Sequence, residues 1–437
     1  MKRVNSLLVI ILSAVMAACG GRNKQSTDTS NTVDVTVNYP EKELTVQDSM
    51  DVEYIRLETN NDFLNQGIVQ DNRQAGSVDF ITVDVRRSYS SRKELLLQDF
   101  MDVEYIALET NDDFLNQGVV LDIGKEIILV RNRIYDGDIF VYDRTGQALR
   151  KINHQGQGPK EYLRAYRAIM DEDKGEIFVC DAFKVLVYDL YGEFKRSFPQ
   201  KEDTGGGYLF IFNYDRDNLI CYDHFNEVIA FVLISKQDGH ITKEIKIPFK
   251  EKKRLRQVSG NDPWDIVGPS GSDNSLIPYN GNWILSEFSS DTVYAFLQDY
   301  SLPPIIARTP SIQSMDPEVM LVLRLLSDRY YFMEAIRNEY NWNTRSGFPR
   351  TFMMYDKQEN AFLGYIVYNG DYSTQKEIYM NAGRPVNHEI ASWQPLEAHH
   401  LVESYRKGEL KDGKLKEIAA TLDEEDNPVI MLIKHRK

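Results

Sequence analysis

The stretch INHQGQGPKEY at 152–162 concentrates residue types that hold phosphate in nucleotide-binding loops. Glycine-rich loops can bring backbone N–H groups close to an anion, but they do so with fixed spacings. Neither Gly-x-x-x-x-Gly-Lys-Ser/Thr nor Gly-x-Gly-x-x-Gly occurs, because Gly156-Gln157-Gly158 is followed by Pro159-Lys160-Glu161. No anion-binding helix follows, since 167–181 has the pattern of a turn and a strand. We therefore predict a structural loop rather than a nucleotide site.

The histidines also lack the spacing of a known site. The segment VNHEIAS at 386–392 has no second histidine for the zinc motif His-Glu-x-x-His, and no Cys-x-x-Cys occurs. Adjacent histidines on a helix point about 100° apart and do not easily share one ligand. The histidines considered are His154, His224, His388, His399 and His400. We predict no metal site and no cofactor, and we nominate no catalytic residue.

The first residues are typical of an exported lipoprotein. A basic start precedes an apolar run, Leu7 to Val15, which is shorter than the roughly 20 residues needed to span a bilayer. Met16-Ala17-Ala18-Cys19 resembles a bacterial lipobox, in which the cysteine after the cleavage site is lipidated. We predict a signal peptide at 1–18, lipid attachment at Cys19 and a polar tether at 19–31. An ordinary signal peptide with an incidental cysteine is the alternative.

The composition indicates a folded protein that does not bind nucleic acid. Apolar residues make up 42% and charged residues 27% of the chain, as in ordinary globular proteins. The formal net charge of −15 disfavours a phosphate-binding face. Cys180 and Cys221 lie in apolar strand-like runs, which favours two buried free thiols over one disulfide.

A 21-residue segment occurs twice near the start of the chain. Residues 51–71 recur at 102–122 with only four differences, and weaker similarity extends back to TVDV at 32 and at 82. Such near-identity indicates a tandem duplication. We assign 32–81 as the extra copy of 82–122 and expect the downstream copy to hold the native place, because it continues directly into the domain at 82–437. The alternative is that both copies pack as ordinary strands.

An older repeat predicts the fold. IFVYDRTGQALRKI at 139–152 aligns with VLVYDLYGEFKRSF at 185–198, an offset of 46 residues. Each unit is an alternating strand, a tight turn and a returning strand, and a period of 40 to 50 residues is typical of propeller blades. The turn residues are Asp143 and Gly146 in the first unit and Asp189 and Gly192 in the second.

The remaining chain predicts six or seven four-stranded antiparallel blades. Short strand-like runs follow at 176–181, 218–223, 227–234, 282–288, 291–297, 361–368 and 427–434. Residues 316–340 carry apolar side chains at helical spacing after Asp316 and Pro317, so we expect a helical insertion there. Two short helices are expected before the C-terminal strand.

The loop at 152–162 lies between two such units, where Gly156 and Gly158 permit sharp turns, Pro159 stiffens the chain and Tyr162 buries its ring. Arg150-Lys151-Ile152 followed by the run from Gly156 to Tyr162 resembles a signature of the six-bladed β-propeller lipoproteins of Bacteroidetes, which are similar to NHL propellers. SSDTVYAF at 289–296 and LDEEDNPVIMLIK at 422–434 resemble further motifs of that family. Lys160 departs from the usual glycine. The resemblance implies a propeller in the cell envelope, with the outer membrane as the expected site.

Three functions are compatible with this sequence. The first is a non-catalytic binding or scaffold module for a glycan, a peptide or an envelope protein, with Trp264, Trp283, Trp342 and Trp393 as candidate stacking residues. The second is a propeller enzyme of the lactonase, lyase or hydrolase type, which needs acid/base groups at the channel. The third is a sensor ectodomain that uses the 316–340 segment. We favour the first.

Overall fold

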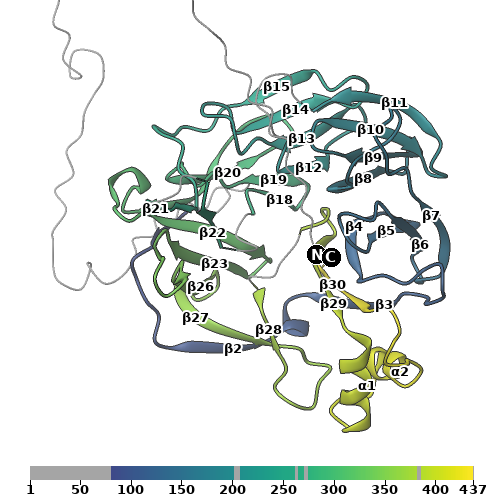
Figure 1. Ribbon diagram of the computed structural model, residues 1–437. Helices are drawn as coiled ribbons and strands as arrows, with labels where there is room; N and C mark the ends of the chain where they lie inside the picture. The colour runs from purple at the N-terminus through teal and green to yellow at the C-terminus, as the bar shows by residue number, and fades with distance from the viewer. Residues whose placement is uncertain (1–79, 201–206, 261–263, 270–273, 381–384, 437) are drawn as a thin grey trace, which may run out of the picture. The chain divides into compact units, whose positions relative to one another are not determined.

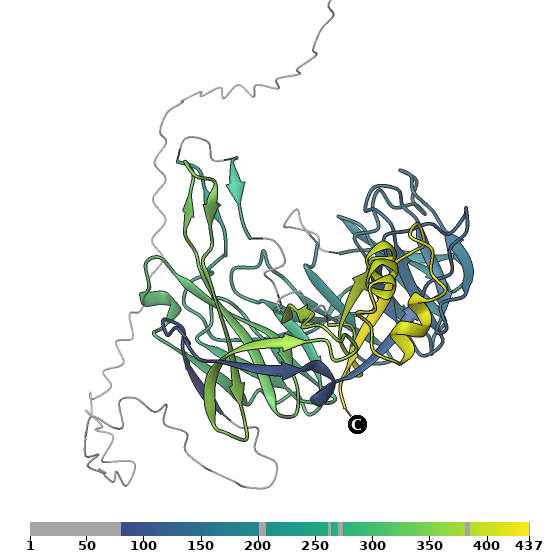
Figure 2. The same ribbon diagram turned by 90° about the horizontal axis from the view of Figure 1, so that it is seen from below.

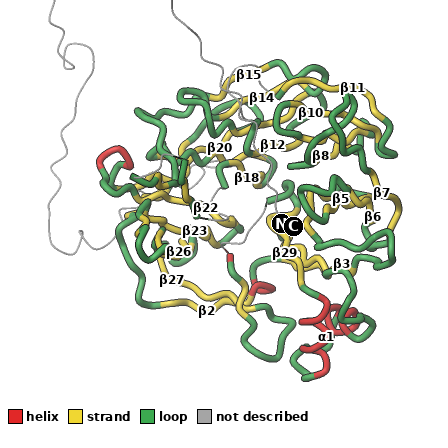
Figure 3. The backbone as a smooth tube through the Cα atoms, in the orientation of Figure 1, coloured by secondary structure: helices red, strands yellow, loops and turns green. Residues whose placement is uncertain are grey.

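The computed structural model describes residues 80–200, 207–260, 264–269, 274–380 and 385–436. The predicted signal peptide, Cys19, the predicted tether and residues 32–79 of the predicted extra copy lie outside the described residues. The described part is a six-bladed β-propeller with two short helices, which confirms the predicted fold class (Figures 1 and 3). The sheets are arranged in sequence around a central channel.

Five blades contain four antiparallel strands each, which follow one another from the channel outward. The first blade consists of β4 (Val119–Ile123), β5 (Ile127–Arg131), β6 (Ile139–Asp143) and β7 (Ala148–Ile152). The second consists of β8 (Arg167–Asp171), β9 (Glu176–Cys180), β10 (Lys184–Asp189) and β11 (Phe194–Pro199). The third consists of β12 (Phe210–Asn213), β13 (Asn218–Tyr222), β14 (Phe231–Ser235) and β15 (Ile241–Ile245). The fourth blade consists of β18 (Leu276–Tyr279), β19 (Asn282–Leu285), β20 (Thr292–Phe296) and β21 (Pro304–Thr309). The fifth consists of β22 (Val319–Leu326), β23 (Tyr330–Arg337), β26 (Arg350–Asp356) and β27 (Ala361–Tyr368).

The sixth blade joins the two ends of the domain. It consists of β29 (Ile390–Leu396), β30 (Val429–Lys434) and β3 (Asp102–Ala107), and β3 runs antiparallel to β30 with Asp102 opposite Lys434. Before reaching this blade, the chain adds β1 (Ile81–Asp84) in parallel to β21 and β2 (Arg92–Leu96) in parallel to β27. The N-terminal part of the domain therefore extends two blades at their outer edges and closes the third.

Short elements complete the chain. They are η2 (Leu97–Asp99), η3 (Ile312–Ser314), β28 (Glu377–Ile378), and two small hairpins, β16 (Gln257–Val258) with β17 (Ile266–Val267) and β24 (Tyr340–Asn341) with β25 (Ser346–Gly347). Figure 2 shows both hairpins projecting from the ring on one face.

Alternation along each strand builds a separate apolar core on both sides of every blade. In β5, Ile127 and Leu129 face the second blade, whereas Ile128 and Val130 face the sixth. Six such cores occupy the six boundaries between blades in the described part of the chain. The alternating strand at 139–142 is consequently buried along its whole length: all four of its residues are buried, because each sheet is covered on both faces.

The blade turns have the geometry that their residue types favour. The Asp143 carboxylate accepts hydrogen bonds from the backbone N–H groups of Thr145 and Gln147, at 2.8 and 3.0 Å. Asp189 makes the same pair of contacts in the second blade. Gly146 and Gly192 have φ of +90° and +96°, a conformation that costs a residue with a Cβ atom.

The loop at 153–166 connects the outer strand of the first blade to the inner strand of the second. Tyr162 is fully buried between these blades, and its hydroxyl donates to the Gly137 carbonyl at 2.7 Å. A Cβ atom on Gly156 would lie 1.9 Å from a carboxylate oxygen of Glu161, which itself accepts the N–H of Gly158. The glycine at 156 thus allows the Glu161 side chain to fold back over the loop, and Pro159 lies at its turn.

The predicted helical insertion at 316–340 is wrong. The segment forms the antiparallel strands β22 and β23, which pair from Val319 opposite Arg337 to Leu326 opposite Tyr331. Both strands are buried on both faces, so their unbroken apolar runs imitate the apolar spacing of a helix. The predicted C-terminal helices are present as α1 (Ala398–Arg406) and α2 (Lys414–Ala419), which connect β29 to β30.

Cys180 and Cys221 are free thiols, as the sequence favours. Both are buried in the core between the second and third blades.

A polar clasp reinforces the ring where its two ends meet. The side chain of Asn427, just before β30, accepts the Asn116 backbone N–H at 2.8 Å and donates to the carbonyls of Glu109 and Phe114. Asn116 in turn donates to the Tyr142 hydroxyl at 2.7 Å. These groups are buried, so each contact satisfies a polar group that water cannot reach.

We predict that Asn427→Ala destabilises the protein by about 1–3 kcal/mol, because it leaves the buried N–H of Asn116 without an acceptor. Denaturant unfolding measures this loss. Glu425→Ala, an exposed change in the same turn, is the control and is expected to leave the stability unchanged. Equal stability of the two variants would contradict the clasp.

Candidate functional site

The centre of the ring contains a cavity of about 1260 Å³. Its walls are the inner strands of the first three blades, β4, β8 and β12, together with β29 and the segment 385–389 that precedes it. The cavity is large enough for a small ligand of several rings, and propellers use this position for ligands. The channel is therefore the candidate site.

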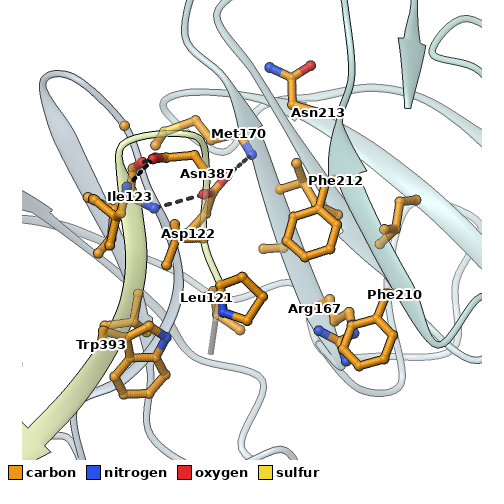
Figure 4. A pocket seen from close by; sticks show the side chains of 18 of the residues that line it. Leu121, Asp122, Ile123, Arg167, Met170, Phe210, Phe212, Asn213, Asn387 and Trp393 are labelled. Atoms are coloured by element: carbon orange, nitrogen blue, oxygen red, sulfur yellow. Dashed lines mark hydrogen bonds between the residues drawn. The ribbon is translucent and has the colours of Figure 1, made fainter. Parts of the chain in front are cut away.

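Aromatic side chains enter the cavity from opposite walls. Phe210 and Phe212 lie on the same side of β12, and Trp393 lies on β29 (Figure 4). The guanidinium of Arg167 lies 4.8 Å from the centre of the Phe210 ring, a cation–π contact that presents a charged donor beside an apolar surface. Phe212 also packs against Trp283, with 5.4 Å between ring centres. The walls thus combine flat apolar surfaces with directional polar groups.

Asp122 is one of the acidic groups that line the channel wall. Its two oxygens accept the backbone N–H groups of Ile123 at 2.8 Å and Met170 at 2.7 Å, so it links the first blade to the second (Figure 4). Asn387 donates to the Ile123 carbonyl at 3.0 Å and joins the sixth blade to the same point. Burial raises the pKa of Asp122 to about 7, although the two N–H donors favour the ionised form. The carboxyl is therefore able to exchange a proton near neutral pH.

His388 lies beside Asn387 at the cavity and contacts the Trp283 ring, with 5.1 Å between ring centres. Burial lowers its pKa to about 4, and the nearby His435 acts in the same direction. The imidazole is consequently neutral at physiological pH and offers one donor and one acceptor.

The candidate histidines do not converge on one site. His154 stacks on Tyr188, with 4.8 Å between ring centres, and one of its ring nitrogens lies 2.7 Å from the Gly192 carbonyl. It therefore packs at the boundary between the first and second blades. His224 lies after β13 in the third blade, and His399 and His400 are neighbours on α1. His388 alone among these five lines the cavity.

The four tryptophans also separate into different environments. Trp283 and Trp393 line the channel and are almost fully buried, at 4% exposure each. Trp264 is 88% exposed near hairpin β16–β17, and Trp342 packs edge-on against Tyr340 beside β24. Two of the four therefore belong to the site.

Sequence reasoning did not find Asp122 or the phenylalanines of β12. The signal for Asp122 is a single charged residue in an apolar inner strand, VVLDI, for which burial is costly unless backbone donors compensate. Phe210 and Phe212 have no such signal, because aromatic residues are common in any strand.

The described residues contain no group of three or more His, Cys, Asp or Glu side chains that could hold a metal ion. Within the same part of the chain, no helix is long and apolar enough to cross a membrane.

Comparison with known proteins identifies a family and a fold. The sequence profile described as Domain of unknown function (DUF4934) matches residues 80–434. Among solved structures, BF0058 of Bacteroides fragilis NCTC 9343, a protein described as exported, aligns with a TM-score of 0.51 at 15% identity, over 82% of this chain and 100% of that one. This likeness shows the propeller fold.

Other solved propellers are more distant. Virginiamycin B lyase of Staphylococcus aureus aligns with a TM-score of 0.29 at 10% identity, over 62% of this chain and 94% of the lyase. A protein of unknown function from Bacteroides thetaiotaomicron VPI-5482 aligns with a TM-score of 0.31 at 11% identity, over 65% of this chain and 71% of that one. These scores support no conclusion about activity. Comparison with curated proteins gives no match.

We predict that Asp122 makes the stability depend on pH. Because its pKa is raised from 3.8 to about 7, its neutral form is favoured in the fold, and stability is lost as the pH rises from about 4 through 7. The loss is at most about 4 kcal/mol, at 1.36 kcal/mol for each pKa unit. Unfolding of the wild type and Asp122→Asn at pH 5 and pH 8 measures it.

The amide variant is expected to lack this loss, so the stability difference between wild type and variant should change between the two pH values. Parallel pH profiles of the two proteins would show that Asp122 does not carry the dependence.

Proposed function

The chain belongs to the family described as Domain of unknown function (DUF4934), and since that description assigns no activity, we propose a function from the channel: the protein is a membrane-anchored, extracytoplasmic propeller that binds a ligand without transforming it. The observation that carries this proposal is the cavity of about 1260 Å³ with aromatic side chains on opposite walls and polar groups between them. A rigid ring with six separate cores is suited to a preformed binding site.

The lining favours a glycan as the ligand in the channel. Sugar rings have apolar faces that pack on aromatic side chains such as Phe210 and Phe212, and their hydroxyl groups need both donors and acceptors. Arg167 and Asn387 supply donors, and the Asp122 carboxyl supplies an acceptor. A short peptide is the second ligand class compatible with these groups.

The position in the cell follows from the first residues of the chain. The lipobox-like sequence ending at Cys19 supports lipid attachment, with residues 20–80 between the lipid and β1. Several acyl chains give a stable anchor, because each buried methylene contributes about 0.8 kcal/mol. We expect the anchor in the outer membrane, and the export described for BF0058 agrees with an extracytoplasmic position.

An enzyme of the lactonase, lyase or hydrolase type is the second candidate, and Asp122 is the observation that favours it. A carboxyl with a pKa of about 7 has the proton affinity of a general acid or base. Within the described residues no second carboxylate is hydrogen-bonded to it, and its oxygens are engaged with two backbone donors. The same geometry is expected of a group that joins two blades, so binding remains the preferred function.

We predict that a glycan array probed with the protein identifies a ligand whose affinity falls about tenfold in Phe210→Ala, since loss of one stacking ring costs about 1–1.5 kcal/mol. Phe352→Ala is the matched control, because Phe352 is 41% exposed on β26 and does not line the cavity. Calorimetry measures both affinities. Chemical conversion of the ligand that is lost in Asp122→Asn would replace the binding proposal by the enzyme.

We predict that Cys19→Ala releases the protein from membranes into the soluble extracytoplasmic fraction, because the substitution removes the atom that carries the lipid. Fractionation of cells that express wild type or variant, followed by immunoblotting, tests this. A variant that remains in the membrane pellet to the same extent as the wild type would refute lipid anchoring at this residue.

A further inference from the structure

The connections between the second and third strands of the blades all lie on one face of the ring. Strands alternate in direction within a blade, so the second strand of every blade ends on the same side. In the first three blades these connections are 132–138, 181–183 and 223–230. We call the surface that they form the loop face. The loop at 153–166 reaches the same side, because it follows the fourth strand of the first blade.

Each of these three connections exposes an aromatic ring to solvent. Tyr135 and Phe183 are each 64% exposed, and Phe225 is 46% exposed. Leu163, at 46%, and Val228, at 71%, add aliphatic surface to the same face. A single exposed apolar residue needs no explanation, but a recurrence at the same position of three consecutive blades indicates an interaction surface.

Hydrogen bonds hold the backbone that carries Tyr135 and Leu163 in a fixed position. Gln155 donates to the carbonyls of Tyr135 at 2.7 Å and Leu163 at 3.2 Å, which ties the first connection to the blade-crossing loop. The Asp181 carboxylate accepts the N–H of Leu163 at 3.0 Å and so ties that loop to the second blade. A surface whose backbone is ordered before binding loses less conformational entropy on binding.

The third connection is ordered in the same manner. The Asp223 carboxylate, almost fully buried, accepts the backbone N–H groups of Phe225 and Asn226, both at 3.1 Å. The side chain of Asn226 then accepts the N–H of Val228 at 2.9 Å. The exposed Phe225 and Val228 are therefore presented by a fixed turn.

The carboxylates of the loop face are engaged within the fold. Those of Asp181 and Asp223 are buried and accept backbone N–H groups, as does the half-buried Asp136. The exposed Glu161 accepts the N–H of Gly158 at 2.8 Å, and the exposed Glu227 pairs with Arg254 at 2.5 Å. The guanidinium groups of Arg133 and Arg164 are exposed, and Arg164 lies 4.4 Å from the centre of the Tyr135 ring. Beside the Tyr135 ring, the charged groups that a partner meets first are therefore cationic, although the chain carries a net charge of −15.

From this arrangement we infer that the loop face over the first three blades docks a partner protein that presents carboxylates around apolar pockets. Tyr135, Phe183 and Phe225 fill the pockets, and Arg133 and Arg164 pair with the carboxylates. Aromatic and arginine side chains are the usual anchors of protein interfaces. The aliphatic Leu163 and Val228 favour a protein over a glycan, because sugar rings stack on aromatic faces. This surface is separate from the channel and does not depend on the proposed ligand there.

Site-specific photocrosslinking in the full-length chain, expressed in its own cell envelope, tests this inference. A photoreactive amino acid replaces Tyr135, Phe183 or Phe225 in turn. All three positions are expected to give an adduct with the same protein. Tyr191, 75% exposed in the turn between β10 and β11 on the opposite face, is the matched control and is expected to give none.

Charge reversal supplies the second measurement. Arg133→Glu combined with Arg164→Glu is expected to reduce the yield of the adduct about tenfold or more, since both side chains would then repel the carboxylates. Both residues are exposed, so circular dichroism should show an unchanged fold. The inference would be overturned if the Tyr191 position gave an equal yield of adduct or if no adduct formed. Adducts that contain only copies of this chain, or that contain a glycan, would also overturn it.

Discussion

The pairing of β3 with β30 is the constraint on which the rest of the structure depends. Residues near the two ends of the domain lie opposite each other along this pair, from Asp102 with Lys434 to Ala107 with Val429. Without it the first and sixth blades would each lose a covered face, and the core that contains Ile106 and Ile430 would open to water. The Asn427 clasp stabilises the same seam. Ring closure thus links the stability of the fold to the shape of the channel, because β4 follows β3 directly.

The six cores explain why the channel is a fixed site. Each blade is an apolar sheet covered on both faces, so no blade can shift without exposing two cores. Polar groups in the wall, such as Asp122, Asn387 and the backbone of Met170, then bridge neighbouring blades at the level of the central cavity. The cost of ordering these groups is met during folding rather than during binding. A site of this kind recognises shape and hydrogen-bonding pattern with little movement.

The sequence predicts the repeated parts of this architecture and not the exceptions. The 46-residue offset between the Val-Tyr-Asp units identifies the blades, because Asp143 and Gly146 make a local turn whose chemistry is independent of the rest of the fold. The segment 319–337 fails for the opposite reason: burial on both faces of β22 and β23 removes the alternation by which a strand is recognised. Phe210, Phe212 and His388 come together only after the ring closes, and spacing along the chain contains no information on that closure.

The position of the downstream copy in the ring gives a structural reason why the two copies of the duplicated segment differ. Residues 102–122 include β3 and most of β4, which close the ring and line the channel, whereas residues 51–71 lie outside the described part. At two of the four differences the downstream copy is apolar and the upstream copy is polar. Ala107 and Leu121 are half-buried and pack against cores, and the upstream copy has Arg56 and Gln70 at these positions. A charged or amide side chain at those two positions would have to be desolvated or would displace its neighbours. The apolar residues Ala107 and Leu121 therefore explain why the downstream copy is the one that closes this ring.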